Sequence, residues 1–185
     1  MISILKLPFV FDSQSLKNDL RKFAPDEWTP HFNKHYYEGD WSGIAFRAPK
    51  GAAVQLYPDP TAGYADTEML ARCSYVAEVL ATFKCELESA RFLRLGAGSN
   101  IREHRDYQLG YEDGVVRVHI PVQTNPQVEF YLDGQKIDMK EGEVWYLNFN
   151  LKHRVVNGGE SDRVHLVVDC VLNNWLRAFF PLENQ

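Results

Sequence analysis

The chain has 185 residues, of which 45% are hydrophobic, and a formal net charge of -5 at pH 7. This length suits one well-buried domain and is short for two, so we expect a single domain over residues 1–185. The negative charge argues against general nucleic-acid binding, and no run approaches the ~18 apolar residues that a membrane span needs. The 3 cysteines are far apart, which is typical of reduced thiols in a cytoplasmic protein.

The first ninety residues predict mixed structure. The apolar run Ile2–Leu7 is typical of a strand. Asp12 or Ser13 is suited to cap a short helix, which Pro25 would follow. This part of the chain therefore begins with a strand and a helix.

Residues 26–65 are rich in aromatic residues, proline and glycine, and predict irregular chain with a strand near Ile44–Arg47. A long helix is predicted next, beginning at Asp66 or Thr67. The apolar positions that follow the helical period are Leu70, Cys73, Val76, Leu80 and Phe83. We expect this one helix to cover a face of a sheet.

From residue 91 to residue 172 the pattern changes to short strands and turns, a predicted β core. The predicted strands are Phe92–Leu95, Val115–Val122, Val128–Leu132, Gln135–Met139, Glu143–Phe149 and Val164–Leu172. Asp133 and Gly134 lie between two of these runs, which is a strong signal for a two-residue hairpin. The pattern favours a mainly β architecture with flanking helices (α+β), built as a sandwich or jelly-roll of antiparallel sheets.

Two histidines and an aspartate form the most informative pattern. His104 and Asp106 are separated by one residue, and on a strand such residues point to the same face and can meet one ion. His153 follows a predicted strand after a hairpin, which is enough chain to cross a barrel and return. Two histidines and one carboxylate form the facial triad of non-haem Fe(II) oxygenases. The alternative is a polar surface loop, with His153 in a polar turn.

Inward-facing cations accompany this pattern. Arg163 begins the last predicted strand and shares a face with His165 and Asp169. A buried arginine is costly unless it is paired, and a bound carboxylate is a suitable bidentate partner. The alternatives are a pair with Asp169 or exposure to solvent. Arg117 and His119 repeat the arrangement on another strand, which favours a cavity that binds an anion.

Several stretches resemble the aspartyl/asparaginyl β-hydroxylase family. They are residues 37–45, residues 117–121 and the motifs spread over residues 142–169, which end in Leu-Val-Val-Asp. The resemblance extends from about Trp28 to Trp175. It implies Fe(II)- and 2-oxoglutarate-dependent dioxygenase activity and a double-stranded β-helix core, the jelly-roll of cupin-like proteins.

The resemblance also implies roles for site residues. His104 and His153 match iron ligands, and Arg163 matches the partner of the distal carboxylate of 2-oxoglutarate. Arg117 and His119 match residues that help to hold this cosubstrate.

One ligand position separates branches of the family. Animal members lack the carboxylate ligand, whereas the chain has Asp106 there and so resembles bacterial relatives that hydroxylate free amino acids such as proline. A serine that assists cosubstrate binding in the animal enzymes is replaced by an apolar residue near Leu93.

We therefore expect a hydroxylase that uses Fe(II), 2-oxoglutarate and dioxygen on an unactivated C–H bond of a small molecule, such as an amino acid. Its alternatives are hydroxylation of Asp, Asn or Pro residues in a peptide or protein, and a non-catalytic cupin-like sensor that binds a metal and a dicarboxylate. Asp40, Arg47 and Tyr107 are candidate substrate contacts. No sequence pattern indicates the oligomeric state.

Overall fold

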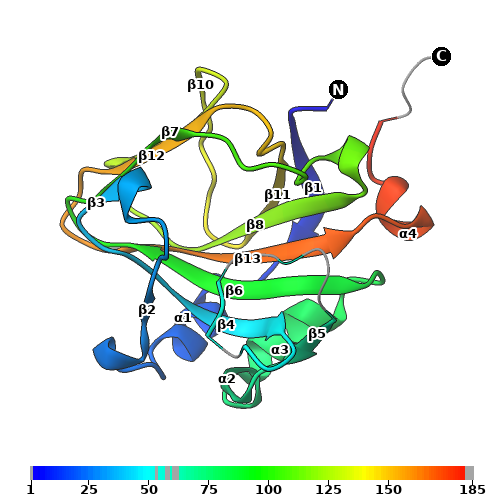
Figure 1. Cartoon of the computed structure of the whole chain (residues 1–185), viewed down its shortest axis with the longest axis horizontal. Coiled ribbons are helices and arrows are strands. Elements are labelled where there is room, and N and C mark those ends of the chain that lie inside the picture. The colour runs from blue at the N-terminus through cyan, green and yellow to red at the C-terminus, as the bar shows by residue number, and fades with distance from the viewer. Residues whose placement is uncertain (1, 53, 57–58, 60–62, 182–185) are drawn as a thin grey trace.

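The computed structural model describes residues 2–52, 54–56, 59 and 63–181, and within them two antiparallel sheets lie one above the other (Figure 1). The major sheet runs in the order β1 (Ile4–Val10), β11 (Glu143–Leu147), β8 (Val115–Gln123), β13 (Arg163–Val171), β6 (Leu87–Leu95), β4 (Trp41–Pro49) and β2 (Thr29–Pro30), with β5 (Tyr64–Asp66) beside β4. The minor sheet runs in the order β10 (Gln135–Lys136), β9 (Val128–Leu132), β12 (His153–Asn157), β7 (Asn100–His104) and β3 (Tyr37–Glu38).

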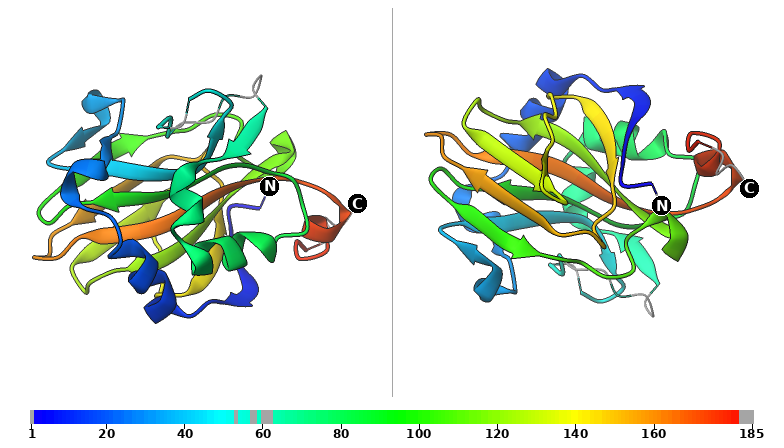
Figure 2. Two further views of the ribbon diagram at one scale, coloured as in Figure 1. Left: turned by 90° about the horizontal axis from the view of Figure 1, so that it is seen from below. Right: turned by 90° about the horizontal axis from the view of Figure 1, so that it is seen from above.

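Helices cover the outer face of the major sheet (Figure 2). They are α1 (Ser13–Leu20), α2 (Glu68–Ala71) and α3 (Ser74–Ala81), while α4 (Asn174–Arg177) follows β13 near the C-terminus. Three short 3-10 turns, η1 (Pro25–Glu27), η2 (Lys34–Tyr36) and η3 (Tyr111–Asp113), lie in the connections. Within the described ranges, no helix has the length and apolar character needed to cross a membrane.

The alternation along β8 and β13 divides the buried residues between two cores. The outward-facing valine, leucine and isoleucine residues of these strands pack under the helices, with Leu16 of α1 and Val76 of α3. The inward-facing residues lie between the sheets, where Leu95, Phe130 and Phe149 belong to a second apolar cluster. The predicted antiparallel sandwich is confirmed, and its interior is where polar residues of β8 and β13 meet.

The prediction of one long helix after residue 66 was wrong. The chain forms α2 and α3 instead, with a break at Cys73, whose φ of -119° and ψ of 79° are not helical. The carboxylate of Asp19 accepts a hydrogen bond from the amide of Val76 at 2.8 Å. This remote acceptor satisfies one of the free amides at the start of α3 and so stabilises the break.

Other differences concern short strands. β6 begins at Leu87, before the predicted core, and the strand predicted for Gln135–Met139 is limited to Gln135–Lys136. The stretch 26–65 contains η1, η2 and the strands β2, β3 and β4 with the start of β5, and its residues 53, 57–58 and 60–62 lie outside the described part. The sequence reading missed β7 and β12, which carry the two candidate histidine ligands.

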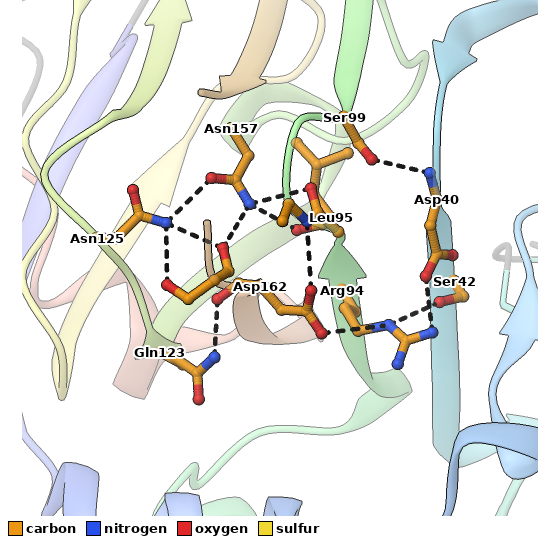
Figure 3. A network of polar contacts seen from close by, with 12 residues as sticks. Asp40, Ser42, Arg94, Leu95, Ser99, Gln123, Asn125, Asn157 and Asp162 are labelled. Carbon is orange, nitrogen blue, oxygen red and sulfur yellow. Dashed lines mark hydrogen bonds and ion pairs between the residues drawn. The ribbon is translucent and has the colours of Figure 1, made fainter. Parts of the chain in front are cut away.

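A buried asparagine fixes the turns at one end of the sandwich (Figure 3). The side-chain amide of Asn157 donates to the carbonyls of Leu95 at 3.0 Å and Ser161 at 2.9 Å. Its oxygen accepts a hydrogen bond from Asn125 at 3.0 Å. Because Leu95 is the cross-strand partner of Arg163, this network holds the start of β13 and the arginine at that position.

Candidate metal centre and cosubstrate cavity

His104, Asp106 and His153 converge, although they are far apart in the sequence. β7 and β12 are neighbours, and their register places His153 opposite His104. Asp106 lies just beyond the end of β7, where its amide donates to the carbonyl of Phe149 at 3.0 Å. One potential ligand atom from each of the three residues lies within 4.8 Å of the others. These three side chains can therefore share one metal ion.

Both histidine rings are oriented by backbone carbonyls. Nδ1 of His104 lies 2.8 Å from the carbonyl oxygen of Arg102, and Nδ1 of His153 lies 3.0 Å from that of Leu151. A hydrogen bond to a carbonyl requires the ring proton on Nδ1, which leaves the Nε2 lone pair free. Metal-binding histidines typically donate their other ring N–H in this way. Burial lowers the pKa of His153 to about 4, so its ring is neutral at pH 7.

The carboxylate of Asp106 is held from its other side. Its Oδ2 accepts a hydrogen bond from Nη1 of Arg117 at 2.7 Å, and its Oδ1 lies 3.7 Å from Nε2 of His104. Oδ1 therefore faces the histidines while Oδ2 is occupied. Nε and Nη2 of Arg117 bind Asp169 at 2.7 and 3.0 Å. Arg117 was predicted to hold the cosubstrate. Its Nε, Nη1 and Nη2 groups donate instead to carboxylates of the protein.

Arg163 has a different environment. It is 3% exposed, and the acid considered as its partner, Asp169, is bound instead by Arg91 and Arg117. Nη2 of Arg163 lies 3.0 Å from Nδ1 of His165. Its Nε has no acceptor among the residues that the structure describes. Burial lowers the pKa of Arg163 to about 9. Among the described residues no carboxylate neutralises this buried cation, as expected for a group that binds an anionic ligand.

Two neutral histidines lie beside Arg163. Burial, followed by the charge of Arg163, lowers the pKa values of His119 and His165 well below 6.5. Nδ1 of His165 accepts from the guanidinium, so Nδ1 of His119, 3.2 Å away, is the donor to it. Nε2 of His119 is then an acceptor, without a partner in the described part of the chain. It suits a water molecule or a hydroxyl group, whereas Arg163 suits a carboxylate.

An inner cavity joins these groups. Its walls include the three candidate metal ligands and also His119, Phe149, Phe130 and Arg163. The ring of His119 stacks on Phe149 with centroids 4.9 Å apart. Leu93 lines the cavity where the resemblance placed the replaced serine. The donor set fits Fe(II), and the unpartnered N–H of Arg163 fits the far carboxylate of 2-oxoglutarate.

An outer pocket of about 300 Å³ shares His104, Asp106 and Arg117 with the inner cavity. Its wall is aromatic. The ring of His31 stacks on Trp41 with centroids 3.5 Å apart and an angle of 11°, and burial lowers the pKa of His31 to about 3. This pocket gives a substrate direct access to the candidate ligands.

Of the three residues predicted to contact the substrate, one lies at the outer pocket and two form ion pairs elsewhere. Tyr107 lines the outer pocket and is 80% exposed. Asp40 pairs with Arg94 at 2.8 Å (Figure 3), and Arg47 forms an ion pair with Asp66. Of the three, Tyr107 lies at the outer pocket and its role stays a prediction, while Asp40 and Arg47 have ion-pair partners of their own.

Arg91 and His31 are among the residues of the outer pocket that the sequence did not reveal. Arg91 lies on β6 two residues before Leu93, so the two face the same side. A charged residue at an alternating position of an apolar run is the signal that could have revealed it. His31 lies in a connection where no periodicity applies.

A family model described as Aspartyl/Asparaginyl beta-hydroxylase matches residues 11–172. The chain belongs to this family. It is 26% identical over 171 residues to L-proline cis-3-hydroxylase 1 of a Streptomyces species, covering 88% of this chain and 58% of that protein. It is 24% identical over 162 residues to L-proline cis-4-hydroxylase of Rhizobium meliloti, covering 86% of this chain and 57% of that protein. The chain thus spans less than two thirds of each relative.

Solved structures show the same fold at low identity. A 2OG-Fe(II) oxygenase family oxidoreductase from Burkholderia pseudomallei superposes with a TM-score of 0.58 and 16% identity, covering 93% of this chain and 86% of that one. A Pseudomonas putida prolyl-4-hydroxylase superposes with a TM-score of 0.55 and 14% identity, covering 93% and 94%. This member of the aspartyl/asparaginyl β-hydroxylase family therefore has the predicted fold class, mainly β with a jelly-roll core.

Proposed function

We propose that the chain is an Fe(II)- and 2-oxoglutarate-dependent dioxygenase that hydroxylates an unactivated C–H bond of a small molecule, most simply an amino acid. One observation carries the proposal. His104, Asp106 and His153 converge with potential ligand atoms close to one another, and their cavity also contains the buried cation of Arg163, which pairs with no acid in the described part of the chain. Family membership and the names of the two curated relatives agree with this chemistry.

In this proposal, His104, Asp106 and His153 would hold Fe(II), the two histidines by the ring nitrogens that their hydrogen bonds to backbone carbonyls leave free. When bound, Fe(II) supplies the redox chemistry that activates dioxygen. Arg163 holds the distal carboxylate of 2-oxoglutarate by charge-assisted hydrogen bonds. His119 orders a water molecule or hydroxyl beside the cosubstrate, and Arg117 orients Asp106 rather than the cosubstrate.

The overall reaction converts a substrate C–H bond to C–OH while 2-oxoglutarate is oxidised to succinate and CO2. One oxygen atom of O2 enters each of the product and succinate. The aromatic wall of the outer pocket orients the substrate and limits the access of water. Tyr107 is the predicted substrate contact that this geometry supports, whereas Asp40 and Arg47 stay predictions.

The site and the relatives support a small molecule as the substrate. Asp106 completes a facial triad, and both curated relatives are named for hydroxylation of L-proline. An outer pocket of about 300 Å³ suits a small molecule. We also propose a single dioxygenase domain that acts in the cytoplasm, where the free thiols of Cys73, Cys85 and Cys170 would stay reduced.

The test supplies the protein with Fe(II), 2-oxoglutarate and O2 and measures succinate. Free amino acids, including L-proline, are then compared with short peptides that contain Pro, Asp or Asn. We expect a free amino acid to increase succinate release in proportion to hydroxylated product. Metal and 2-oxoglutarate binding without any succinate would instead indicate the sensor, and product from peptides alone would indicate a peptidyl hydroxylase.

A further inference from the structure

We propose that 2-oxoglutarate enters its site, and succinate leaves it, through a second pocket that the substrate does not use. Residues 124–126, β9 and residues 136–141 form most of the wall of this rear pocket, whose volume is about 750 Å³. Among the residues that the structure describes, it shares no lining residue with the outer pocket. The inference rests on the proposed function and deepens it, because it gives the cosubstrate an entrance of its own.

Arg163 lies at the boundary between the rear pocket and the inner cavity. Its side chain lines both spaces, and so does that of Phe130. His165, which accepts a hydrogen bond from Arg163, also lines the rear pocket. The rear pocket thus extends to the residue proposed to hold the distal carboxylate without passing the candidate metal ligands. In this proposal, the Phe130 ring moves aside to admit the cosubstrate.

The way from the outer pocket to Arg163 is narrower. It leads through the inner cavity, whose volume is about 40 Å³, on the order of the space that one water molecule occupies in the liquid. His104, Asp106 and Arg117 line both the outer pocket and the inner cavity. A metal ion on these ligands, with a substrate in front of it, would leave no space for a dicarboxylate to pass. A cosubstrate limited to this way could exchange only while the outer pocket is empty.

The charges around the rear pocket suit a dicarboxylate. The charged side chains in its wall are Lys136, Lys140, Arg163, Asp138 and Glu141. Lys136 pairs with Glu129 at 2.9 Å and Glu141 pairs with Lys17 at 2.6 Å. With these partners included, four cations face three carboxylates. The excess positive charge attracts an anion toward the pocket.

Hydrogen bonds between distant segments fix the walls of the rear pocket. The carboxylate of Glu141 accepts from Lys17 of α1 and from the amide of Thr124, the latter at 3.1 Å. Nδ2 of Asn125 donates to Oδ1 of Asn157 at 3.0 Å (Figure 3). These contacts join α1, the β8–β9 connection and β12, so the rear pocket is a regular part of the fold.

The first test narrows the rear pocket and follows labelled 2-oxoglutarate on the Fe(II)-loaded protein without O2. Val128 is half-buried, lines the rear pocket and shares a face of β9 with Phe130, so Val128→Trp places a large ring in the pocket. We expect the association and dissociation rates both to fall on the order of tenfold while Kd stays within about threefold, because an obstruction slows both directions equally.

Val156→Trp is the matched control. Val156 is half-buried on β12 and lies opposite Glu129, so it faces away from Val128 and the rear pocket. An unchanged or faster dissociation rate in a folded Val128→Trp protein would overturn the inference, and so would equal slowing in both variants. Failure of the wild-type protein to bind 2-oxoglutarate at all would instead refute the proposed function.

The second test closes the outer pocket of the wild-type protein with substrate. The probe is the free amino acid with the highest activity in the panel, beginning with L-proline, at saturation and without O2. We expect it to slow the dissociation of labelled 2-oxoglutarate by less than about fivefold, because the rear route stays open. A larger decrease would show that the cosubstrate leaves through the outer pocket and would overturn the inference. If Val128→Trp does not fold, this test decides.

Discussion

Asp106 and Arg117 form an ion pair of 2.7 Å in the wall of the candidate metal centre. The pair uses Oδ2 of Asp106 and leaves Oδ1 directed toward His104. Because Arg117 is itself anchored on the fully buried Asp169, the carboxylate ligand is held in place before a metal arrives. Preorganisation of this kind reduces the entropy that metal binding must overcome.

Arg117→Met is expected to weaken Fe(II) binding roughly 10- to 100-fold, because the partner that orients the carboxylate ligand is lost. Anaerobic titration with Fe(II), or with Co(II) followed by absorbance, measures the change. Lys152→Met is the control, since Lys152 forms an exposed ion pair with Glu103 near the site. An unchanged metal affinity with a raised KM for 2-oxoglutarate would assign Arg117 to the cosubstrate, as the family resemblance implies.

His153→Ala is expected to abolish Fe(II) binding and succinate formation, because it removes one of the three candidate ligands. Among the described residues, no other side chain joins this cluster to replace it. Metal content after anaerobic loading and succinate release are the two measurements. His35→Ala is the matched control, because His35 is an exposed histidine in η2. Full activity of the His153→Ala protein would remove His153 from the metal centre.

Arg163→Met is expected to have opposite effects on cosubstrate binding and on stability. The KM for 2-oxoglutarate should rise on the order of 100-fold, because a buried charge pair with the distal carboxylate is lost. The ligand-free protein should become more stable by about 1–4 kcal/mol, because a buried cation without an acid partner is replaced by an apolar side chain. Urea unfolding without 2-oxoglutarate measures the second effect. A strong loss of stability would show that Arg163 is compensated within the folded chain.

The sequence was informative where a local rule governs the structure. Alternation along β8 and β13 correctly predicted that Arg117, His119 and Arg163 face away from the packed helices. The Asp133–Gly134 hairpin and the cap at Asp12 were also correct, since both depend on neighbouring residues. The period of two for a strand and the chemistry of a turn need no information from the rest of the fold.

The sequence failed where contacts between distant segments decide. The break before α3 depends on Asp19, more than fifty residues earlier in the chain. β12 is short and polar at its start, and it forms because β7 and β9 flank it. The sequence likewise could not show which cations pair with Asp169. Two arginines from β6 and β8 reach this carboxylate, and only the three-dimensional order of the strands shows that Arg163 does not.

Stability of the metal-free protein is expected to fall as the pH decreases from 7.5 to 5.5. Burial keeps His119 and His165 neutral, with pKa values well below 6.5, while the unfolded chain takes up protons on both near pH 6.5. The unfolded state then binds more protons than the folded state, so the free energy of unfolding falls as the pH is lowered, by about 1 kcal/mol per histidine between pH 6.5 and 5.5. Urea unfolding at three pH values measures the slope.

His165→Gln separates this effect from the other titrating groups. The glutamine oxygen can still accept from Arg163 but does not titrate, so the slope should become shallower by the contribution of one histidine. His35→Gln, at an exposed position, should leave the slope as it is. A wild-type stability that does not change over this range, or an identical slope in the His165→Gln protein, would mean that the buried histidines accept protons without loss of the fold.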